Sequence, residues 1–81
     1  MKVRYFSWLR ERTGCASEEV STSAATARDL VAVLSAQSDG HAAAFSDIAV
    51  IRVAIDQEMT DLDASIEGAS EVAFFPPVTG G

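Results

Sequence analysis

The chain has 81 residues, 48% of them hydrophobic, which suits one small domain with a real core. Its net charge of −6, from 12 acidic and 6 basic residues, argues against nucleic acid, whose phosphates would repel it. The acidic surface is compatible with a basic protein partner, or it only keeps the domain soluble. One cysteine excludes an internal disulfide, no apolar run approaches the roughly 18 residues of a membrane span, and no signal peptide opens the chain. We therefore expect a cytoplasmic protein.

The first strand is predicted over residues 2–8, with apolar side chains on both faces. One face carries Val3 and Tyr5, and the other carries Phe6 and Trp8. This pattern favours an inner strand, or one whose end meets a partner. A helical turn or loop follows over residues 9–12 and closes at Thr13-Gly14. Residues 18–23 are then predicted to form a polar edge strand, antiparallel to the first.

The main helix is predicted over residues 26–37. Thr26 is placed to cap its N-terminus, with Asp29 three residues later. The apolar face is narrow enough to cover one side of a sheet, and it consists of Ala27, Leu30, Val31 and Leu34. Asp39-Gly40 is expected to end the helix, and residues 41–45 are expected to add a short helical turn.

The second half of the chain is predicted to add three strands. Residues 50–56 alternate, with Ile51, Val53 and Ile55 facing inward and Arg52 and Asp56 facing outward. Residues 57–60 turn back as a short strand, and Leu62 and Ile66 fill the core from an irregular segment. The final strand, residues 71–75, places Val72 and Phe74 on the core. One helix on one face of a mixed sheet of four or five strands is an α+β, two-layer design, and this element order fits a β-grasp.

The C-terminal segment follows the last strand directly. Pro76 and Pro77 end that strand, because neither can donate a ladder hydrogen bond. We therefore expect a domain over residues 1–77 and a flexible tail over residues 78–81. A Gly-Gly end can thread a slot too narrow for any side chain, and its reactive group is then the carboxylate of Gly81.

Residues 74–81, Phe-Phe-Pro-Pro-Val-Thr-Gly-Gly, resemble the C-terminus of the small subunits of molybdopterin synthase, a family of ubiquitin-like sulfur carriers. Weaker similarity over residues 3–6, 26–30 and 53–58 extends the match to nearly the whole chain. The resemblance implies a β-grasp fold in which the first and last strands lie side by side, parallel, at the centre of the sheet. The helical crossover between them is what parallel pairing requires.

The resemblance also implies the chemistry of the C-terminus. An adenylating activating enzyme uses ATP and magnesium to activate Gly81, and sulfur then replaces AMP to leave a thiocarboxylate. Gly81 donates this sulfur to a pterin precursor in the active site of the large subunit, with which the chain forms a heterotetramer. Residues Val78, Thr79 and Gly80 would thread into that site, and the large subunit would contact Phe75, Pro76 and Pro77. The chain would not be catalytic alone and would bind no cofactor itself.

Three other groups are weighed as sites and set aside. Cys15 has no second cysteine and is expected to have no histidine near it to lower its pKa, so no chemical role is expected. His41 is interpreted as a surface residue. The acidic residues Asp56, Glu58, Asp61 and Asp63 lack the glycine and the closing glutamate of a calcium loop, which favours a solvated turn. We therefore expect no metal site.

Some alternatives remain open at this point. Phe75 is either buried in a partly covered far side of the sheet or an exposed anchor for a partner. A sulfur carrier of another pathway, such as the thiamine type, also ends in Gly-Gly. A ubiquitin-like conjugator would use the same adenylation but transfer its acyl group to an amine. A plain interaction module would have an inert tail.

Overall fold

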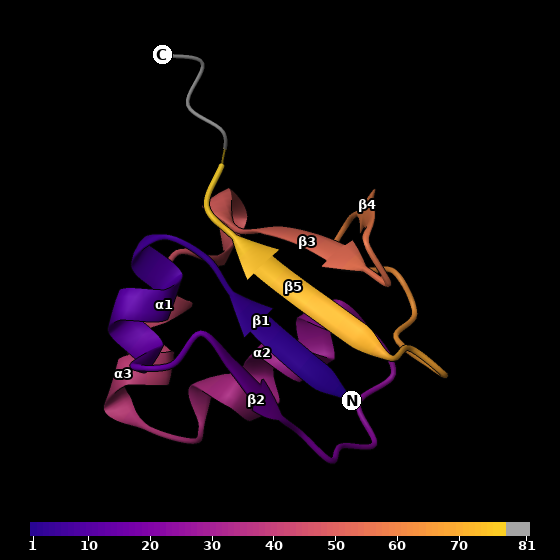
Figure 1. Ribbon diagram of the computed structural model, residues 1–81, viewed down its shortest axis with the longest axis horizontal. Coiled ribbons are helices and arrows are strands. Elements are labelled where there is room, and N and C mark those ends of the chain that lie inside the picture. The colour runs from indigo at the N-terminus through magenta and orange to yellow at the C-terminus, as the bar shows by residue number, and fades with distance from the viewer. Residues whose placement is uncertain (78–81) are drawn as a thin grey trace.

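The computed structural model describes residues 1–77 as one five-stranded sheet with helices packed on one face (Figure 1). Along the chain the elements are β1 (Lys2–Tyr5), α1 (Trp8–Thr13), β2 (Ser17–Glu19), α2 (Ala27–Ser35), α3 (Asp39–Ala44), the 3-10 helix η1 (Ile48–Val50), β3 (Arg52–Ile55), β4 (Glu58–Thr60) and β5 (Glu71–Phe75). No helix described over residues 1–77 is long and apolar enough to cross a membrane. The predicted flexible tail, residues 78–81, lies outside the described residues.

The strand order is β2-β1-β5-β3-β4, with β1 and β5 parallel at the centre. Their register pairs Val3 with Val72 and Tyr5 with Phe74, so the side chains of each pair share a face. The pairs β1–β2, β3–β5 and β3–β4 are antiparallel. This is the mixed sheet of a β-grasp, and it confirms the predicted fold class and the central position of the last strand.

The core lies between the sheet and the helices. Of the residues predicted to face the core from the main helix, from the strand over residues 50–56 and from the final strand, all but one are buried: Ala27, Leu30, Val31, Leu34, Ile51, Val53, Val72 and Phe74. The exception, Ile55, is half-buried, because it ends β3 beside β4, whose residues are all exposed. Leu62 and Ile66 enter the core from the irregular segment, as predicted. Complete burial of a side chain such as Leu34 contributes roughly 1.5–3 kcal/mol to folding.

The main helix begins where the sequence predicts and ends earlier. The Thr26 hydroxyl accepts a hydrogen bond from the Asp29 backbone N–H at 3.1 Å, which confirms the N-cap. The helix ends at Ser35, two residues before the predicted end.

The prediction that Asp39-Gly40 ends the helix is wrong, because these two residues begin α3. Ser38 caps this second helix by accepting a hydrogen bond from the His41 N–H at 3.1 Å. A Cβ on Gly40 would lie 2.3 Å from the Arg12 carbonyl oxygen, so the glycine permits α1 and α3 to approach closely.

Both N-terminal strands are shorter than predicted. The chain leaves the sheet after β1 because Ser7 takes a positive φ of 54°, and the predicted strand residue Trp8 begins α1 instead. Gly14, with φ 85°, ends that helix in the left-handed conformation. The edge strand β2 spans only Ser17–Glu19 instead of residues 18–23, although its antiparallel pairing with β1 is as predicted.

Candidate functional site: an apolar patch on the open face of the sheet

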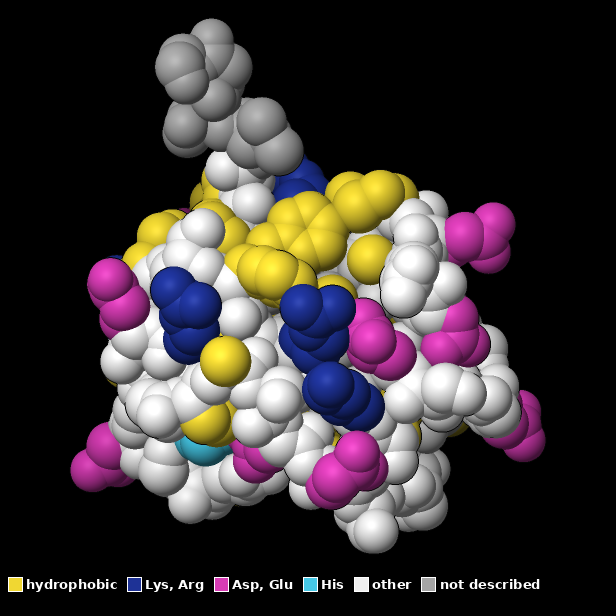
Figure 2. Space-filling view, viewed as in Figure 1, with side chains coloured by type: hydrophobic (Ala, Val, Ile, Leu, Met, Phe, Trp, Pro, Cys, Tyr) yellow, Lys and Arg dark blue, Asp and Glu magenta, His cyan; other side chains and the backbone are white. Residues whose placement is uncertain are grey.

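The face of the sheet turned away from α2 carries an apolar patch near the C-terminal end of β5 (Figure 2). We call Phe6, Met59, Phe75, Pro76 and Pro77 the open-face patch. Phe6 and Met59 are 37% and 64% exposed, and the other three are half-buried. Contiguous exposed apolar surface of this kind marks interaction sites more often than chance. Its last member, Pro77, directly precedes residues 78–81 in the sequence.

The pleat of the sheet explains why the patch is hollowed. On the open face, the register places Arg4, Ala73, Ala54 and Met59 in one row across four strands. The two alanines are short and buried, and they line the floor of a hollow of about 820 Å³ whose walls include the open-face patch and Trp8. A partner side chain can therefore enter the surface at this point.

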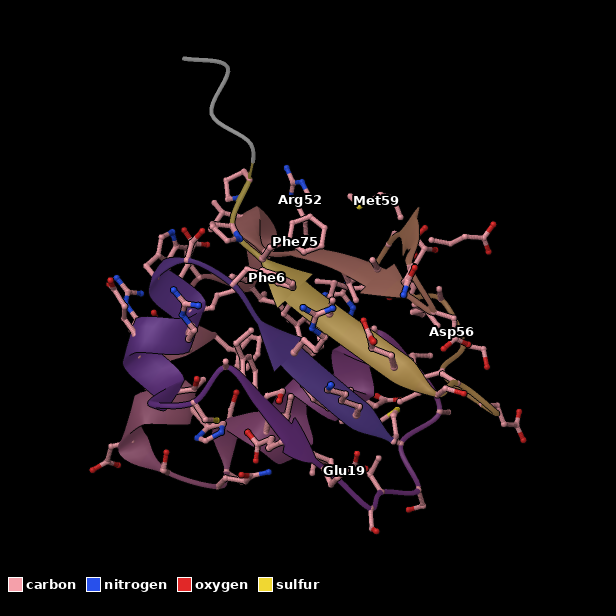
Figure 3. The ribbon with its side chains drawn as sticks, in the orientation of Figure 1. Phe6, Glu19, Arg52, Asp56, Met59 and Phe75 are labelled. Atoms are coloured by element: carbon pink, nitrogen blue, oxygen red, sulfur yellow. The ribbon has the colours of Figure 1, made fainter. Side chains whose placement is uncertain are left out.

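Phe75 lies on the open face and outside the helix-side core. Its ring packs edge-to-face on Phe6, with centroids 6.3 Å apart and planes at 84°, as Figure 3 shows. The Arg4 guanidinium lies 4.9 Å from the centroid of the Phe6 ring and 3.5 Å from a Glu71 carboxylate oxygen. Of the two positions left open for Phe75, the structure gives a half-buried residue on a surface patch rather than a core residue.

The turn before β4 fixes where β5 begins. Asp56 and Gln57 take positive φ values of 48° and 70°, and the Asp56 Oδ1 accepts hydrogen bonds from the Ser70 and Glu71 N–H groups, both at 2.9 Å. These bonds set the start of β5 and hence the position of Phe75, four residues further on. Sequence reasoning placed Asp56 in a solvated acidic group and missed this role.

Two further residues of this acidic group have partners: Asp61, whose carboxylate accepts a hydrogen bond from the Asp63 N–H at 2.9 Å, and Asp63. Asp63 is the one that forms an ion pair. Its carboxylate binds the Arg28 guanidinium at 2.8 Å on the surface of α2, and this contact lowers the pKa of Asp63. Asp56 and Asp63 therefore serve two separate links of the fold. Their side chains offer no shared cation site among the groupings found in residues 1–77.

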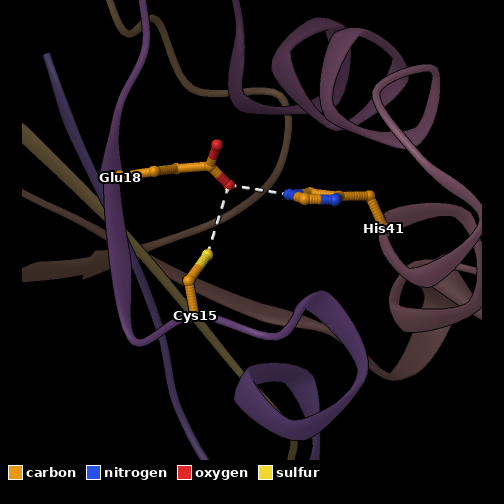
Figure 4. A group of neighbouring side chains, drawn as sticks. All are labelled: Cys15, Glu18 and His41. Carbon is orange, nitrogen blue, oxygen red and sulfur yellow. Dashed lines mark hydrogen bonds and ion pairs between the residues drawn. The ribbon is translucent and has the colours of Figure 1, made fainter.

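A second cluster joins Cys15, Glu18 and His41, which come from the loop before β2, from β2 and from α3 (Figure 4). One Glu18 carboxylate oxygen lies 2.7 Å from the His41 Nε2 and 3.7 Å from the Cys15 Sγ, and it accepts a hydrogen bond from the Tyr5 hydroxyl at 2.8 Å. The predictions that Cys15 has no histidine near it and that His41 is a surface residue are both wrong. His41 is only 7% exposed, because α3 packs against α1 and α2.

The surroundings of the cluster shift the pKa values of Cys15, Glu18 and Tyr5. Burial, with smaller contributions from Glu18, raises the pKa of Cys15, although the Thr13 hydrogen bond opposes this. Burial would also raise the pKa of Glu18, but the hydrogen bonds from His41 and Tyr5 outweigh it and lower that pKa. Burial and the Glu18 carboxylate raise the pKa of Tyr5, so its hydroxyl stays a donor. A protonated Cys15 thiol is a poor nucleophile, which makes it an unsuitable rival to a C-terminal sulfur.

The predicted site residues fall into two groups. Phe75, Pro76 and Pro77 come together on the open face. Val78, Thr79, Gly80 and Gly81 lie outside the described residues, so their predicted roles stay predictions.

The sheet order, the helical crossover and the apolar patch at the end of the last strand define a ubiquitin-like β-grasp domain. Its sequence matches the model of the ThiS family over residues 3–81, and the chain belongs to that family.

Comparisons with individual proteins agree. The chain is 38% identical to the molybdopterin synthase sulfur carrier subunit of Escherichia coli over 81 residues, covering 100% of this chain and 99% of the relative. It is 33% identical to the subunit of the same name from Haemophilus influenzae, with the same coverage. Among solved structures, SAMP1 from Haloferax volcanii superposes with a TM-score of 0.73 at 26% identity, covering 100% of this chain and 98% of that one. A putative molybdopterin converting factor subunit 1 from Pyrococcus furiosus has a TM-score of 0.73 at 25% identity, covering 95% of both chains.

Proposed function

We propose that this chain is the sulfur-carrier subunit of a molybdopterin synthase. The observation that carries the proposal is its similarity, over essentially the full length of both chains, to two proteins of that name. The structure supports this proposal with an apolar patch at the end of the last strand, just before the segment that ends in Gly-Gly. A carrier needs both a surface that its partners recognise and a terminal group that they modify.

The reacting group in this proposal is the carboxylate of Gly81. A carboxylate is a poor electrophile, so one of its oxygens first attacks the α-phosphorus of ATP, in an activating enzyme that supplies magnesium, and pyrophosphate leaves. A sulfur nucleophile then displaces AMP from the acyl adenylate, and the resulting C-terminal thiocarboxylate is ionised at neutral pH and nucleophilic. Glycine at both terminal positions keeps the path to either active site free of side chains.

The partners follow from this chemistry. The large subunit would supply the catalytic site and the contacts to the pterin precursor, while this chain would donate sulfur and would not be catalytic alone. The large subunit and the adenylating enzyme would bind in turn to the surface formed by Phe75, Pro76 and Pro77. Binding there would direct the terminal glycines into the active site of each partner. ATP and magnesium would belong to the activating enzyme, and the whole sequence of reactions would take place in the cytoplasm.

Reconstitution with the large subunit tests the pathway. The chain, converted to its thiocarboxylate, is incubated with purified large subunit and the pterin precursor, and molybdopterin formation is followed by fluorescence of its oxidised product. We expect product with this chain and none with its carboxylate form. If the thiocarboxylate supports thiazole formation for thiamine but not molybdopterin formation, the chain serves the thiamine pathway instead.

One observation favours a second candidate. The crystal structure of small archaeal modifier protein 1 from H. volcanii superposes on this chain with a TM-score of 0.70 at 27% identity. A modifier would transfer the same activated acyl group from Gly81 to an amine of another protein. Mass spectrometry of trypsin-digested cell extracts for lysine-containing peptides that carry residues 53–81 of this chain, lost when Gly81 is deleted, would support that function.

A further inference from the structure

We propose that Cys15, Glu18 and His41 form a binding site for one zinc-type divalent cation. This inference is independent of the proposed sulfur-carrier function. It begins from the fact that three ligand types converge from three separate segments, with one ligand atom from each lying within 4.8 Å of the others. Thiolate, imidazole and carboxylate are the groups that bind Zn²⁺ in proteins, and the mixture of sulfur and nitrogen ligands disfavours Mg²⁺ and Ca²⁺.

Two of the three separations are within roughly an ångström of those of a tetrahedral site, and the third, between the Cys15 Sγ and the His41 ring nitrogen, is at most 4.8 Å and shortens as the side chains close on the cation. With Zn–S near 2.3 Å and Zn–N near 2.0–2.1 Å, neighbouring ligand atoms lie roughly 3.3–3.6 Å apart. The Cys15 Sγ is already 3.7 Å from the Glu18 carboxylate oxygen. The contact of 2.7 Å between Glu18 and the His41 Nε2 must open by roughly half an ångström for a cation to enter. Cys15 and Glu18 are only half-buried, so both side chains have room for this adjustment.

Outer hydrogen bonds hold the ligands in place. The Ser38 hydroxyl lies 2.7 Å from the His41 Nδ1, which leaves Nε2 to face the cluster. A hydroxyl can donate to or accept from that nitrogen, so Ser38 suits the imidazole both with and without a cation. Tyr5 donates to the same Glu18 oxygen that contacts His41 and Cys15. Metal-bound histidines and carboxylates are oriented by outer partners of this kind.

Charge and access also fit. The Glu18 side chain is 22% exposed while that of His41 is 8% exposed, so solvent reaches the cluster from the carboxylate side. The neutral His41 imidazole would bind through Nε2 with its proton on Nδ1, facing Ser38, and the thiol proton of Cys15 would leave to solvent. The thiolate and the carboxylate then balance the two positive charges. Three protein ligands leave a fourth position for water.

A bound cation would link α3 to β2 and to the loop that precedes it. Cys15 and Glu18 lie on one side of this junction and His41 on the other. A cation that binds only the folded chain raises its stability in proportion to the logarithm of the cation concentration above the dissociation constant. The site would thus make the stability of the domain depend on available zinc.

The test uses the untagged full chain under reducing conditions, because its one cysteine and one histidine give unambiguous signals. Co²⁺ is titrated in as a spectroscopic probe. We expect a thiolate-to-cobalt charge-transfer band that saturates at one equivalent and disappears when Zn²⁺ is added. In a parallel ¹⁵N NMR titration with Zn²⁺, the His41 Nε2 signal should move by more than the Nδ1 signal, as expected for a coordinated Nε2.

The variants separate the site from surface binding. Cys15→Ser, at a half-buried position, should still fold and lose both the charge-transfer band and the rise in melting temperature that Zn²⁺ gives the wild type. Glu19→Gln removes the adjacent exposed carboxylate, which pairs with the N-terminal amine, and should leave both signals unchanged. Absence of the thiolate band at one equivalent, or a band without any change at the His41 Nε2, would overturn the proposal.

Discussion

Phe74 and Phe75 are neighbours in β5 and have opposite surroundings. Phe74 is completely buried, and its ring packs edge-to-face on Phe45 with centroids 5.1 Å apart. Phe75 points to the other face, where its main aromatic neighbour is the exposed Phe6. One strand therefore supplies a residue to the core and, at the next position, a residue to the surface patch. The alternation of side chains along a strand makes this division possible within a single residue step.

The same contrast holds for the two faces of the sheet. On the helix side, α2 and the loops close over the large apolar side chains. On the open side, none of the helices described over residues 1–77 covers the open-face patch, which leaves Met59 mostly exposed. Exposed apolar area gives no stability to the isolated chain. We propose that a partner covers this apolar area beside the C-terminal segment.

The largest effect should come from breaking the covered face. Phe74→Ala removes a fully buried ring and should destabilise the domain by about 3–5 kcal/mol. Urea unfolding followed by circular dichroism measures this loss. Leu34→Ala, in the facing helix, is the matched control and should cost about 2–5 kcal/mol. Near-native stability of Phe74→Ala would contradict the assignment of this face to the core.

A substitution on the open face should weaken partner binding and leave stability nearly unchanged. Phe75→Ala should weaken binding to the large subunit by about 2 kcal/mol, because exposed aromatic anchors dominate interface energies. Its unfolding free energy should stay close to that of the wild type. Calorimetric titration against the large subunit, together with urea unfolding, separates the two quantities. A large loss of stability with unchanged binding would return Phe75 to the core.

The turn that positions β5 should show an intermediate effect. Asp56→Ala removes the acceptor of two backbone N–H groups at a position with positive φ, and should cost about 1–3 kcal/mol. Asp56→Asn keeps an acceptor oxygen and tolerates the left-handed conformation, so it should cost less. Equal losses in the two variants, measured by urea unfolding, would show that the hydrogen bonds to Ser70 and Glu71 are not the cause.

The smallest expected effect is on the loss of stability at acid pH. The pKa of Glu18 is lowered in the folded chain, so its contribution to stability is present above its ordinary value of 4.5 and is lost as the pH falls through the lowered pKa. Between about pH 5.5 and about pH 3, Glu18→Gln should therefore lose less stability than the wild type. Glu19→Gln serves as the control with an exposed carboxylate. Equal acid sensitivity of Glu18→Gln and the wild type would mean that the contacts with His41 and Tyr5 do not favour the ionised form.

The sequence predicted the parts of this structure that depend on periodicity. Alternation placed Val72 and Phe74 inward and Phe75 outward, and helical spacing placed Leu30 and Leu34 in the core. These patterns are local, so a single sequence contains them. The final strand was predicted with its observed bounds, because the two prolines mark where it must end.

What the sequence did not predict depends on contacts between distant segments. Glu18 in β2 and His41 in α3 are 23 residues apart, and only the tertiary packing of the domain brings them within hydrogen-bonding distance. Asp39-Gly40 has the composition of a helix end, yet Gly40 is required by the close approach of Arg12 in another helix. In the same way, nothing in the run of acidic residues distinguishes Asp56, whose carboxylate holds the start of β5.

We propose that the carboxylate of Gly81 carries sulfur while the rest of the chain folds and binds independently of it. Intact-mass spectrometry of the chain, before and after incubation with the activating enzyme, ATP, magnesium and a sulfur donor, tests this most directly. The wild type should gain the mass of one oxygen exchanged for sulfur. A chain extended by one residue after Gly81 should fold normally and gain nothing, because displacing a reacting group from its position costs large factors in rate. If the extended chain acquires sulfur without first being trimmed, Gly81 is not the carrier.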